Sequence, residues 1–270
     1  MAFLEALRGE RAAIQDFKGK LIPFGALLAA LAVGAVLLIL LRVNPLVAYA
    51  HMVLGAVGNL DGLAETLVKT TPLLLAGLSV ALAFKCGVWN IGAEGQLYVG
   101  ALAAVGIGIN QLHLPPPFLL PLAILMGFLC AALWGLITGF LKVYLQANEV
   151  IVTIMLNYIA ILGASYLVNG PWAMGTVPIT KRIESSAELP LLVPGTRLHA
   201  GFLIAVVASL LVYVIIFKTR LGYEMRAMGH NPDAALYAGM RVNRIAVIAL
   251  GLGGGLAGLA GRMWNSPPRR

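Results

Sequence analysis

The chain has 270 residues, of which 60% are hydrophobic and 11% are charged, and its mean hydropathy is +0.90. This composition excludes an ordinary soluble domain and indicates an integral membrane protein. The net charge of +8 does not indicate nucleic-acid binding, because the nineteen Lys and Arg residues are scattered between apolar runs. The two cysteines, Cys86 and Cys130, supply neither a disulfide framework nor a metal cluster.

The first half of the chain begins with a mixed segment that leads into an apolar run. Residues 1–20 predict a short interfacial helix on the cytoplasmic side. Residues 21–41 carry no charge, and at about 1.5 Å per residue they cross a hydrocarbon core of about 30 Å. Residues 42–70 predict an extracytoplasmic loop with a surface helix. The apolar run 71–84 is only fourteen residues long, which indicates a discontinuous or inclined helix.

Five further apolar runs complete an all-helical, polytopic transmembrane bundle of about seven spans, some of them short or discontinuous. We expect these runs at 91–109, 118–141, 149–168, 200–217 and 245–260. With the N-terminus in the cytoplasm, eleven basic residues fall in inner segments and five in outer loops, which favours this orientation. The remaining three, Arg262, Arg269 and Arg270, would lie outside against this rule. The predicted divisions are a cytoplasmic segment at 1–20, a transmembrane domain at 21–261 with a cytoplasmic loop at 218–244, and an atypical tail at 262–270.

Polar residues interrupt the apolar pattern between residues 85 and 100. Asn90, Glu94 and Tyr98 recur every four residues and share one helix face, whereas Gln96 lies about 200° from Glu94 on a regular helix. Polar groups at membrane depth usually face a bundle interior or a water-filled path. Asn90 and Glu94 either bond a polar solute in such a path, or Glu94 pairs with Lys85 and holds the bundle together.

A second polar stripe opens the run near residue 149. Asn148 is predicted to cap this helix, and Glu149 suits its first turn. Asn157 lies deeper in the span, where capping does not explain an amide. It either lines a path or bonds a neighbouring helix.

Residues 218–244 predict two short helices joined by a turn. Gly229 is placed to end the first helix, and Asn231 to cap the second. Pro232 suits the first helical position, Asp233 suits the helix N-terminus, and Gly239 ends the unit. Such complete punctuation favours a docking element for a partner over an ordinary solvated loop.

The glycine-rich run 253–258 matches Gly-x-Gly-x-x-Gly by letter, but it follows no predicted strand and lies in an apolar segment. Dinucleotide binding is therefore excluded in favour of close helix packing by small residues four positions apart. The four histidines are isolated in sequence, so no metal site is expected.

Three ordered segments resemble ABC-importer permeases of the branched-chain amino acid, ribose and nucleoside type, and are most similar to its simple-sugar and nucleoside branch. The segments are 85–97, 148–160 and 219–240. The resemblance implies a multi-pass permease of the plasma (inner) membrane that imports a small polar solute. Its implied partners are a second permease subunit, two cytoplasmic ABC ATPase subunits or domains and an extracytoplasmic solute-binding protein, with no nucleic acid.

The resemblance also assigns roles to residues. It implies a substrate path at Asn90, Glu94 and Gln96, and ATPase coupling at Gly229, Asn231, Pro232, Asp233, Ala234, Ala235 and Gly239. Asn157 is added to the predicted path because of its depth in the span. The sequence contains no Gly-x-x-x-x-Gly-Lys-[Ser/Thr] phosphate loop, so we expect no catalytic residues and no cofactor on this chain. ATP is expected on the partner subunit.

The family pattern usually continues through more spans after the glycine-rich helix, whereas this chain ends at Gly261-Arg-Met-Trp-Asn-Ser-Pro-Pro-Arg-Arg270. This departure favours a truncated or frame-shifted C-terminus, and the alternative is a short natural variant. If the late spans are missing, a non-functional truncated permease is an alternative to the importer. Two other functions stay open: an ion-coupled secondary transporter that uses Glu94 or Glu149, and a structural membrane anchor that tolerates alanine at all these positions.

Overall fold

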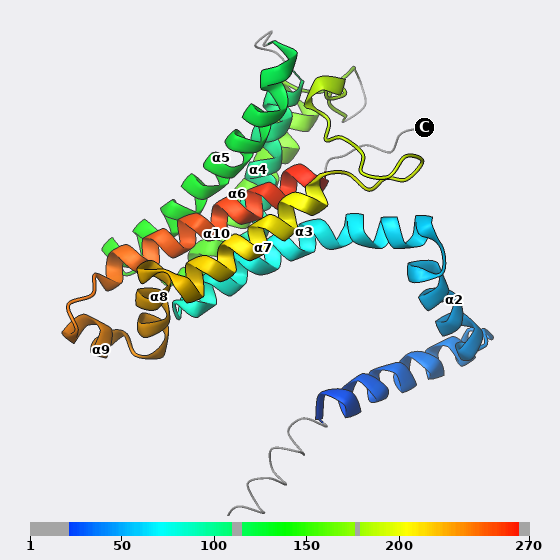
Figure 1. Ribbon diagram of the computed structural model, residues 1–270, viewed down its shortest axis with the longest axis horizontal. Helices are drawn as coiled ribbons and strands as arrows, with labels where there is room; N and C mark the ends of the chain where they lie inside the picture. The colour runs from blue at the N-terminus through cyan, green and yellow to red at the C-terminus, as the bar shows by residue number, and fades with distance from the viewer. Residues whose placement is uncertain (1–21, 110–114, 176–178, 265–270) are drawn as a thin grey trace, which may run out of the picture. The chain divides into compact units, whose positions relative to one another are not determined.

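A computed structural model describes residues 22–109, 115–175 and 179–264 (Figure 1). These residues form helices and connecting segments, and an isolated β-bridge joins Leu191 to His199. The chain divides into two compact units, residues 1–63 and 64–270, with helix α3 crossing the boundary. The predicted N-terminal helix at 1–20 and most of the atypical tail lie outside the described residues.

The predicted all-helical bundle is confirmed. The described helices are Ile22–Leu40, α2 (Pro45–Val57), α3 (Leu60–Lys85), α4 (Ala93–Gly108), α5 (Pro116–Tyr144), α6 (Glu149–Asn169), α7 (Gly201–Lys218), α8 (Arg220–His230), α9 (Pro232–Tyr237) and α10 (Val242–Trp264), with a 3₁₀ turn η1 at Ser185–Ala187. Six of the described helices are long and apolar enough to cross a membrane: Ile22–Leu40, α3, α5, α6, α7 and α10. Helix α4, with 16 residues, is shorter.

The prediction for residues 42–84 is wrong at one point. The loop expected up to residue 70 and the short run after it are replaced by α2 and by the continuous 26-residue helix α3. Polar residues near the start of α3 are compatible with a helix because they form ion pairs and hydrogen bonds with residues one turn away. Glu65 and Lys69 lie one turn apart with 3.8 Å between Oε1 and Nζ, and the Thr70 hydroxyl donates to the Thr66 carbonyl (2.7 Å).

Residues 22–63 are described as a unit by themselves. Within this unit the helix Ile22–Leu40 buries none of its apolar residues, so their burial requires lipid or another protein surface. The Tyr49 hydroxyl of α2 donates to the Leu31 carbonyl (2.7 Å), and Asn44 caps α2 by accepting from the Leu46 N–H (3.0 Å).

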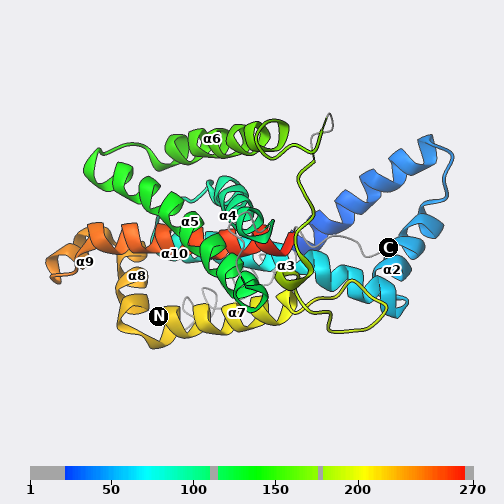
Figure 2. The same ribbon diagram turned by 90° about the horizontal axis from the view of Figure 1, so that it is seen from above.

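Helix α10 is the central element of the second unit and packs against α4 and α5 (Figures 1 and 2). In its apolar stretch 78% of the residues are buried, whereas in each of the other five candidate spans of the described chain at most 33% are. Glycines allow this approach: a Cβ added to Gly100 of α4 would lie 2.3 Å from the Gly258 Cα, and one on Gly254 would lie 2.4 Å from the Ala131 carbonyl oxygen of α5. The predicted packing role of the glycine-rich run is confirmed.

Candidate functional site

The helical path is broken between α3 and α4. Helix α3 ends at Lys85 and α4 begins at Ala93, so the backbone of residues 86–92 makes no regular helical ladder. Gly87 has a φ of +69°, which turns the chain in a conformation that side-chain-bearing residues rarely adopt. Backbone groups inside a bundle need partners, and nearby polar side chains supply them at this break.

Asn90 and Gln96 form a buried pair at the break. Asn90 Nδ2 donates to Gln96 Oε1 (3.1 Å), and Gln96 Nε2 donates to Asn90 Oδ1 (3.3 Å). Asn90 also donates to the Ser79 hydroxyl of α3 (3.4 Å) and accepts from the Gly92 N–H (3.1 Å). With exposed fractions of 2% and 1%, both amides lie inside the protein and stabilise the connection between α3 and α4.

Asn157 connects α6 to the same break. Its Oδ1 accepts from the Gly95 N–H (2.8 Å), and its Nδ2 donates to the Ile91 carbonyl (3.0 Å). Gly95 lies in the first turn of α4, and the N-cap residue Gly92 has no side chain with which to cap that turn. Asn157 therefore caps α4 from a neighbouring helix. Capping signals in the sequence are local, so they could not reveal a cap from a residue 62 positions away.

Glu94 and Tyr98 lie on a face of α4 that points away from Gln96, and they line a pocket of about 630 Å³. The remaining walls come from α6, from Trp172 and residues 180–183, and from Gly261 of α10. Trp172 packs over α4, where a Cβ added to Gly106 would lie 3.3 Å from its ring. The sequence places Tyr98 on the Glu94 stripe but gives no sign that Trp172, in a distant loop, joins them.

This Glu94 pocket combines a carboxylate with two aromatic side chains in a largely apolar wall. Aromatic faces suit a flat base or the apolar face of a sugar ring, and a carboxylate accepts hydrogen bonds from hydroxyl or amino groups. Lys181 and Arg182 add positive charge to the lining. Of the four predicted path residues, only Glu94 lines this pocket, whereas Asn90, Gln96 and Asn157 hold the helix that carries it.

Helices α8 and α9 have the predicted punctuation with one exception. Asn231 accepts from the N–H groups of Asp233 and Ala234 (both 3.0 Å), Pro232 is the first helical residue, and Gly239 has a φ of +79°. The expectation that Gly229 ends the first helix is wrong, because α8 continues to His230. Gly229 instead fits a close contact: a Cβ there would lie 2.2 Å from the Lys85 carbonyl oxygen.

The contact at Gly229 places α8 directly against the break. Gly87 of the break also contacts Gly229, since a Cβ added to Gly87 would lie 3.4 Å from the Gly229 Cα. Met225 and Met228 are buried in the same apolar cluster as Cys86 and Val88. On α9, Ala235 is buried, whereas Leu236 and Tyr237 are 63% and 94% exposed. Helices α8 and α9 thus join the end of α3 to an exposed apolar surface.

Glu149 is engaged at the junction of α5 and α6. Its carboxylate lies 2.7 Å from Lys142 Nζ, and both side chains are partly exposed. Asn148 caps α6 as predicted, accepting from the Val150 N–H (2.9 Å). In the described part of the chain, no group of three His, Cys, Asp or Glu side chains is placed to hold a metal ion.

Comparison with known proteins agrees with this architecture. The family model described as branched-chain amino acid transport system / permease component matches residues 62–265. The chain is 41% identical over 251 residues to a glucose ABC transporter permease of Haloferax volcanii, covering 88% of this chain and 66% of the relative. It is 38% identical over 248 residues to a guanosine ABC transporter permease of Bacillus subtilis, covering 90% and 71%.

A nucleoside ABC transporter permease of Lactococcus lactis is 32% identical over 255 residues, covering 91% of this chain and 70% of the relative. The chain therefore spans about two thirds of the length of these relatives. No solved structure matches significantly. Since the family model covers most of the chain, this protein belongs to the family of branched-chain amino acid transport system permease components.

Proposed function

We propose that the chain is a permease subunit of an ATP-driven importer for a nucleoside or simple sugar, acting as one half of a permease pair. The relatives named above are permeases for glucose, guanosine and nucleosides, which are small, neutral and rich in hydroxyl groups. The proposed setting is the plasma (inner) membrane with the N-terminus in the cytoplasm. The proposed partners are two ABC ATPase subunits or domains, a second permease and an extracytoplasmic solute-binding protein.

The observation that carries the choice of solute is the Glu94 pocket. A carboxylate beside Tyr98 and Trp172 suits a ligand with both a ring face and several hydrogen-bond donors. Lipid or a purely apolar solute would itself offer the carboxylate no hydrogen-bond donor. We infer that Glu94 bonds the hydroxyl or amino groups of the solute while the two aromatic side chains cover its ring.

The proposed coupling route begins at α8 and α9, where the exposed Leu236 and Tyr237 would meet an ATPase. Because Gly229 of α8 contacts the Lys85 carbonyl, movement of α8 would displace the end of α3. The displacement would then pass along residues 86–92 to α4, which carries Glu94 and is capped by Asn157. Because the pocket is lined by α4, a shift of this helix against α6 would change access to it.

The solute assignment is tested by uptake of labelled guanosine and glucose in cells that express the chain with the ATPase, second permease and binding protein encoded beside it. We expect Glu94→Gln to weaken the apparent affinity by about ten-fold or more, as for loss of a charged hydrogen bond. Tyr98→Ala should act in the same direction. Tyr158→Ala is the matched control, because Tyr158 is exposed on α6 and does not line the pocket.

Uptake that is unchanged in both pocket variants would contradict the assignment of the pocket. The energy source is tested separately with the parent chain. An importer of the proposed kind loses uptake when the ATPase carries an inactive nucleotide site and keeps it when a protonophore collapses the ion gradient. The opposite pattern would support an ion-coupled secondary transporter with Glu94 as its ion site.

A further inference from the structure

A second pocket lies at the ends of α3 and α10 that are far from α8. Its volume is about 330 Å³, and its walls come from the first turns of α3, the segment 183–199 and the end of α10. Six charged or titratable side chains line it: Glu65, Lys69, Glu188, Arg197, His199 and Arg262. This pocket adjoins the Glu94 pocket, since Ile183 lines both, but none of the functions discussed above uses it.

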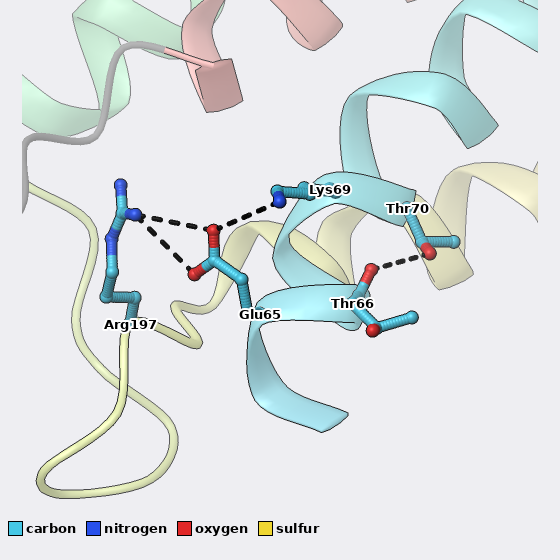
Figure 3. Close-up of polar contacts among 5 residues, drawn as sticks. All are labelled: Glu65, Thr66, Lys69, Thr70 and Arg197. Atoms are coloured by element: carbon cyan, nitrogen blue, oxygen red, sulfur yellow. Dashed lines mark hydrogen bonds and ion pairs between the residues drawn. The ribbon is translucent and has the colours of Figure 1, made fainter. Parts of the chain in front are cut away.

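Both carboxylates of this pocket have cationic partners. Figure 3 shows Arg197 and Lys69 approaching the same carboxylate, with Arg197 Nη1 3.4 and 3.5 Å from the two oxygens of Glu65 and Lys69 Nζ 3.8 Å from Oε1. Glu188 Oε1 lies 3.3 Å from Arg182 Nη2. The lining thus holds three permanent cations, Lys69, Arg197 and Arg262, and two carboxylates. One of the carboxylates, Glu188, is also paired with Arg182, which does not line the pocket.

His199 adds a hydrogen-bond donor to this positively charged lining. Its Nδ1 accepts from the Gly201 N–H (3.1 Å), so in the neutral ring Nε2 carries the hydrogen. The pKa of His199 is lowered by burial, and further by the charges of Arg262 and Arg197, which keeps the ring neutral. Nε2 is buried and has no hydrogen-bond partner in the described structure.

Arg262 supplies a second donor of the same kind. Its side chain is 2% exposed, and one terminal N–H donates to the Ala187 carbonyl. Its Nε–H is buried and has no acceptor among the described residues. A buried donor without an acceptor is costly, so two of them in the wall of one cavity indicate an acceptor that belongs inside it.

We propose that this pocket binds a small free oxyanion, a carboxylate or phosphate, between His199, Arg262 and Arg197. Oxyanion oxygens accept hydrogen bonds without donating any, so they match a wall whose unpaired groups are all donors. The negative charge offsets the surplus of cations in the lining. The pocket volume admits an ion of this size together with water.

The test is the thermal unfolding of the purified 270-residue chain in detergent, with sodium phosphate or acetate compared against sodium chloride at equal ionic strength. We expect an anion at about 100 times its Kd to raise the unfolding midpoint by roughly 5 °C. Arg197→Gln and His199→Asn should abolish this rise. Asparagine at 199 still offers an acceptor to Gly201 but removes the Nε2 donor.

Arg220→Gln is the matched control, since Arg220 is likewise an arginine paired with a glutamate (2.9 Å) but lines a different pocket. This variant should keep the full rise in midpoint. Equal midpoints in phosphate, acetate and chloride would overturn the proposal. So would a rise of the same size in Arg197→Gln and Arg220→Gln, because that result would show a general salt effect.

Discussion

Single polar side chains stabilise the break between α3 and α4, and Asn157 is the one that reaches it from α6. Two hydrogen bonds from one amide hold the first turn of α4 and the Ile91 carbonyl. We expect Asn157→Ala to lower the free energy of unfolding by about 1–3 kcal/mol, because the buried Gly95 N–H loses its acceptor and the Ile91 carbonyl loses its donor. The midpoint in detergent should fall by several degrees.

Asn169→Ala is the control for this measurement. Asn169 belongs to the same helix and also donates to a backbone carbonyl, that of Ser165 (2.8 Å), but its side chain is exposed. Its removal should change the midpoint little. An equal loss in the two variants would show that the Asn157 cap contributes nothing particular to α4.

His199 gives a pH dependence whose sign follows from its surroundings. Its pKa lies below the ordinary value of 6.5 because of burial and the nearby arginines Arg262 and Arg197. As the pH falls below 6.5, the unfolded chain takes up a proton that the folded chain does not, so the folded state loses stability. The loss reaches at most about 1.4 kcal/mol for each pH unit.

The measurement is the unfolding midpoint between about pH 7.5 and pH 5 for the parent chain and His199→Asn, with the upper end above the ordinary histidine pKa. The comparison cancels the titration of the other charged groups in that pocket, Lys69, Arg197, Arg262 and the two glutamates. The parent should lose more stability on acidification than the variant. Parallel curves would contradict the lowered pKa.

At the scale of elements, α8 and the end of α3 form one mechanical unit. The contact depends on the absence of a side chain at Gly229, where a Cβ would lie 2.2 Å from the Lys85 carbonyl oxygen. Gly229→Ala should therefore move α8 away from the break. We expect uptake to fall several-fold while the ATPase still co-purifies, because the exposed face of α9 is unchanged.

Gly77→Ala is the control for the substitution itself, since Gly77 lies within α3 and a Cβ there has nothing within 4 Å. This variant should transport like the parent. Normal uptake by Gly229→Ala would mean that the coupling force does not pass through the contact with Lys85. Loss of the ATPase from the purified complex would mean that Gly229 acts in docking and not in transmission.

The elements show which information is local in this sequence. The cap at Asn231, the proline after it and Gly239 are read correctly because each acts on neighbours within a few residues. The sequence misplaces the start of α3, in which Glu65 is paired with Arg197, 132 positions away. Likewise, Gly229 resembles a helix end until the Lys85 carbonyl is seen against it. The sequence suffices to assign residues 62–265 to a family. It does not suffice to predict which side chains share a pocket.

For the whole molecule, the proposed orientation predicts which surfaces face the cytoplasm. Single cysteines at Tyr237 of α9 (94% exposed) and Val193 of the segment before α7 (40% exposed) would report on opposite sides. In intact spheroplasts, a membrane-impermeant maleimide should label Val193→Cys, and it should label Tyr237→Cys only after permeabilisation. Labelling in the reverse order would invert the orientation.

The native cysteines set the background of this experiment. Burial raises the pKa of the Cys86 thiol to about 12, so almost no reactive thiolate exists at neutral pH. Cys86 can therefore stay in place, and only Cys130, which is less buried, needs replacement by alanine. The Cys130→Ala parent without an added cysteine should remain unlabelled on both sides.

The burial of α10 also bears on how the protein is made. Helices enter the membrane in the order of synthesis, and α10 follows α4 and α5 along the chain although it packs against both of them. The surfaces of α4 and α5 that receive it, including Gly100 and Ala131, must stay unoccupied until α10 has been synthesised. During that interval the nascent bundle has an unfilled seam. Final packing of the bundle therefore depends on its last described helix, and an incomplete chain exposes surfaces that are prone to misassembly.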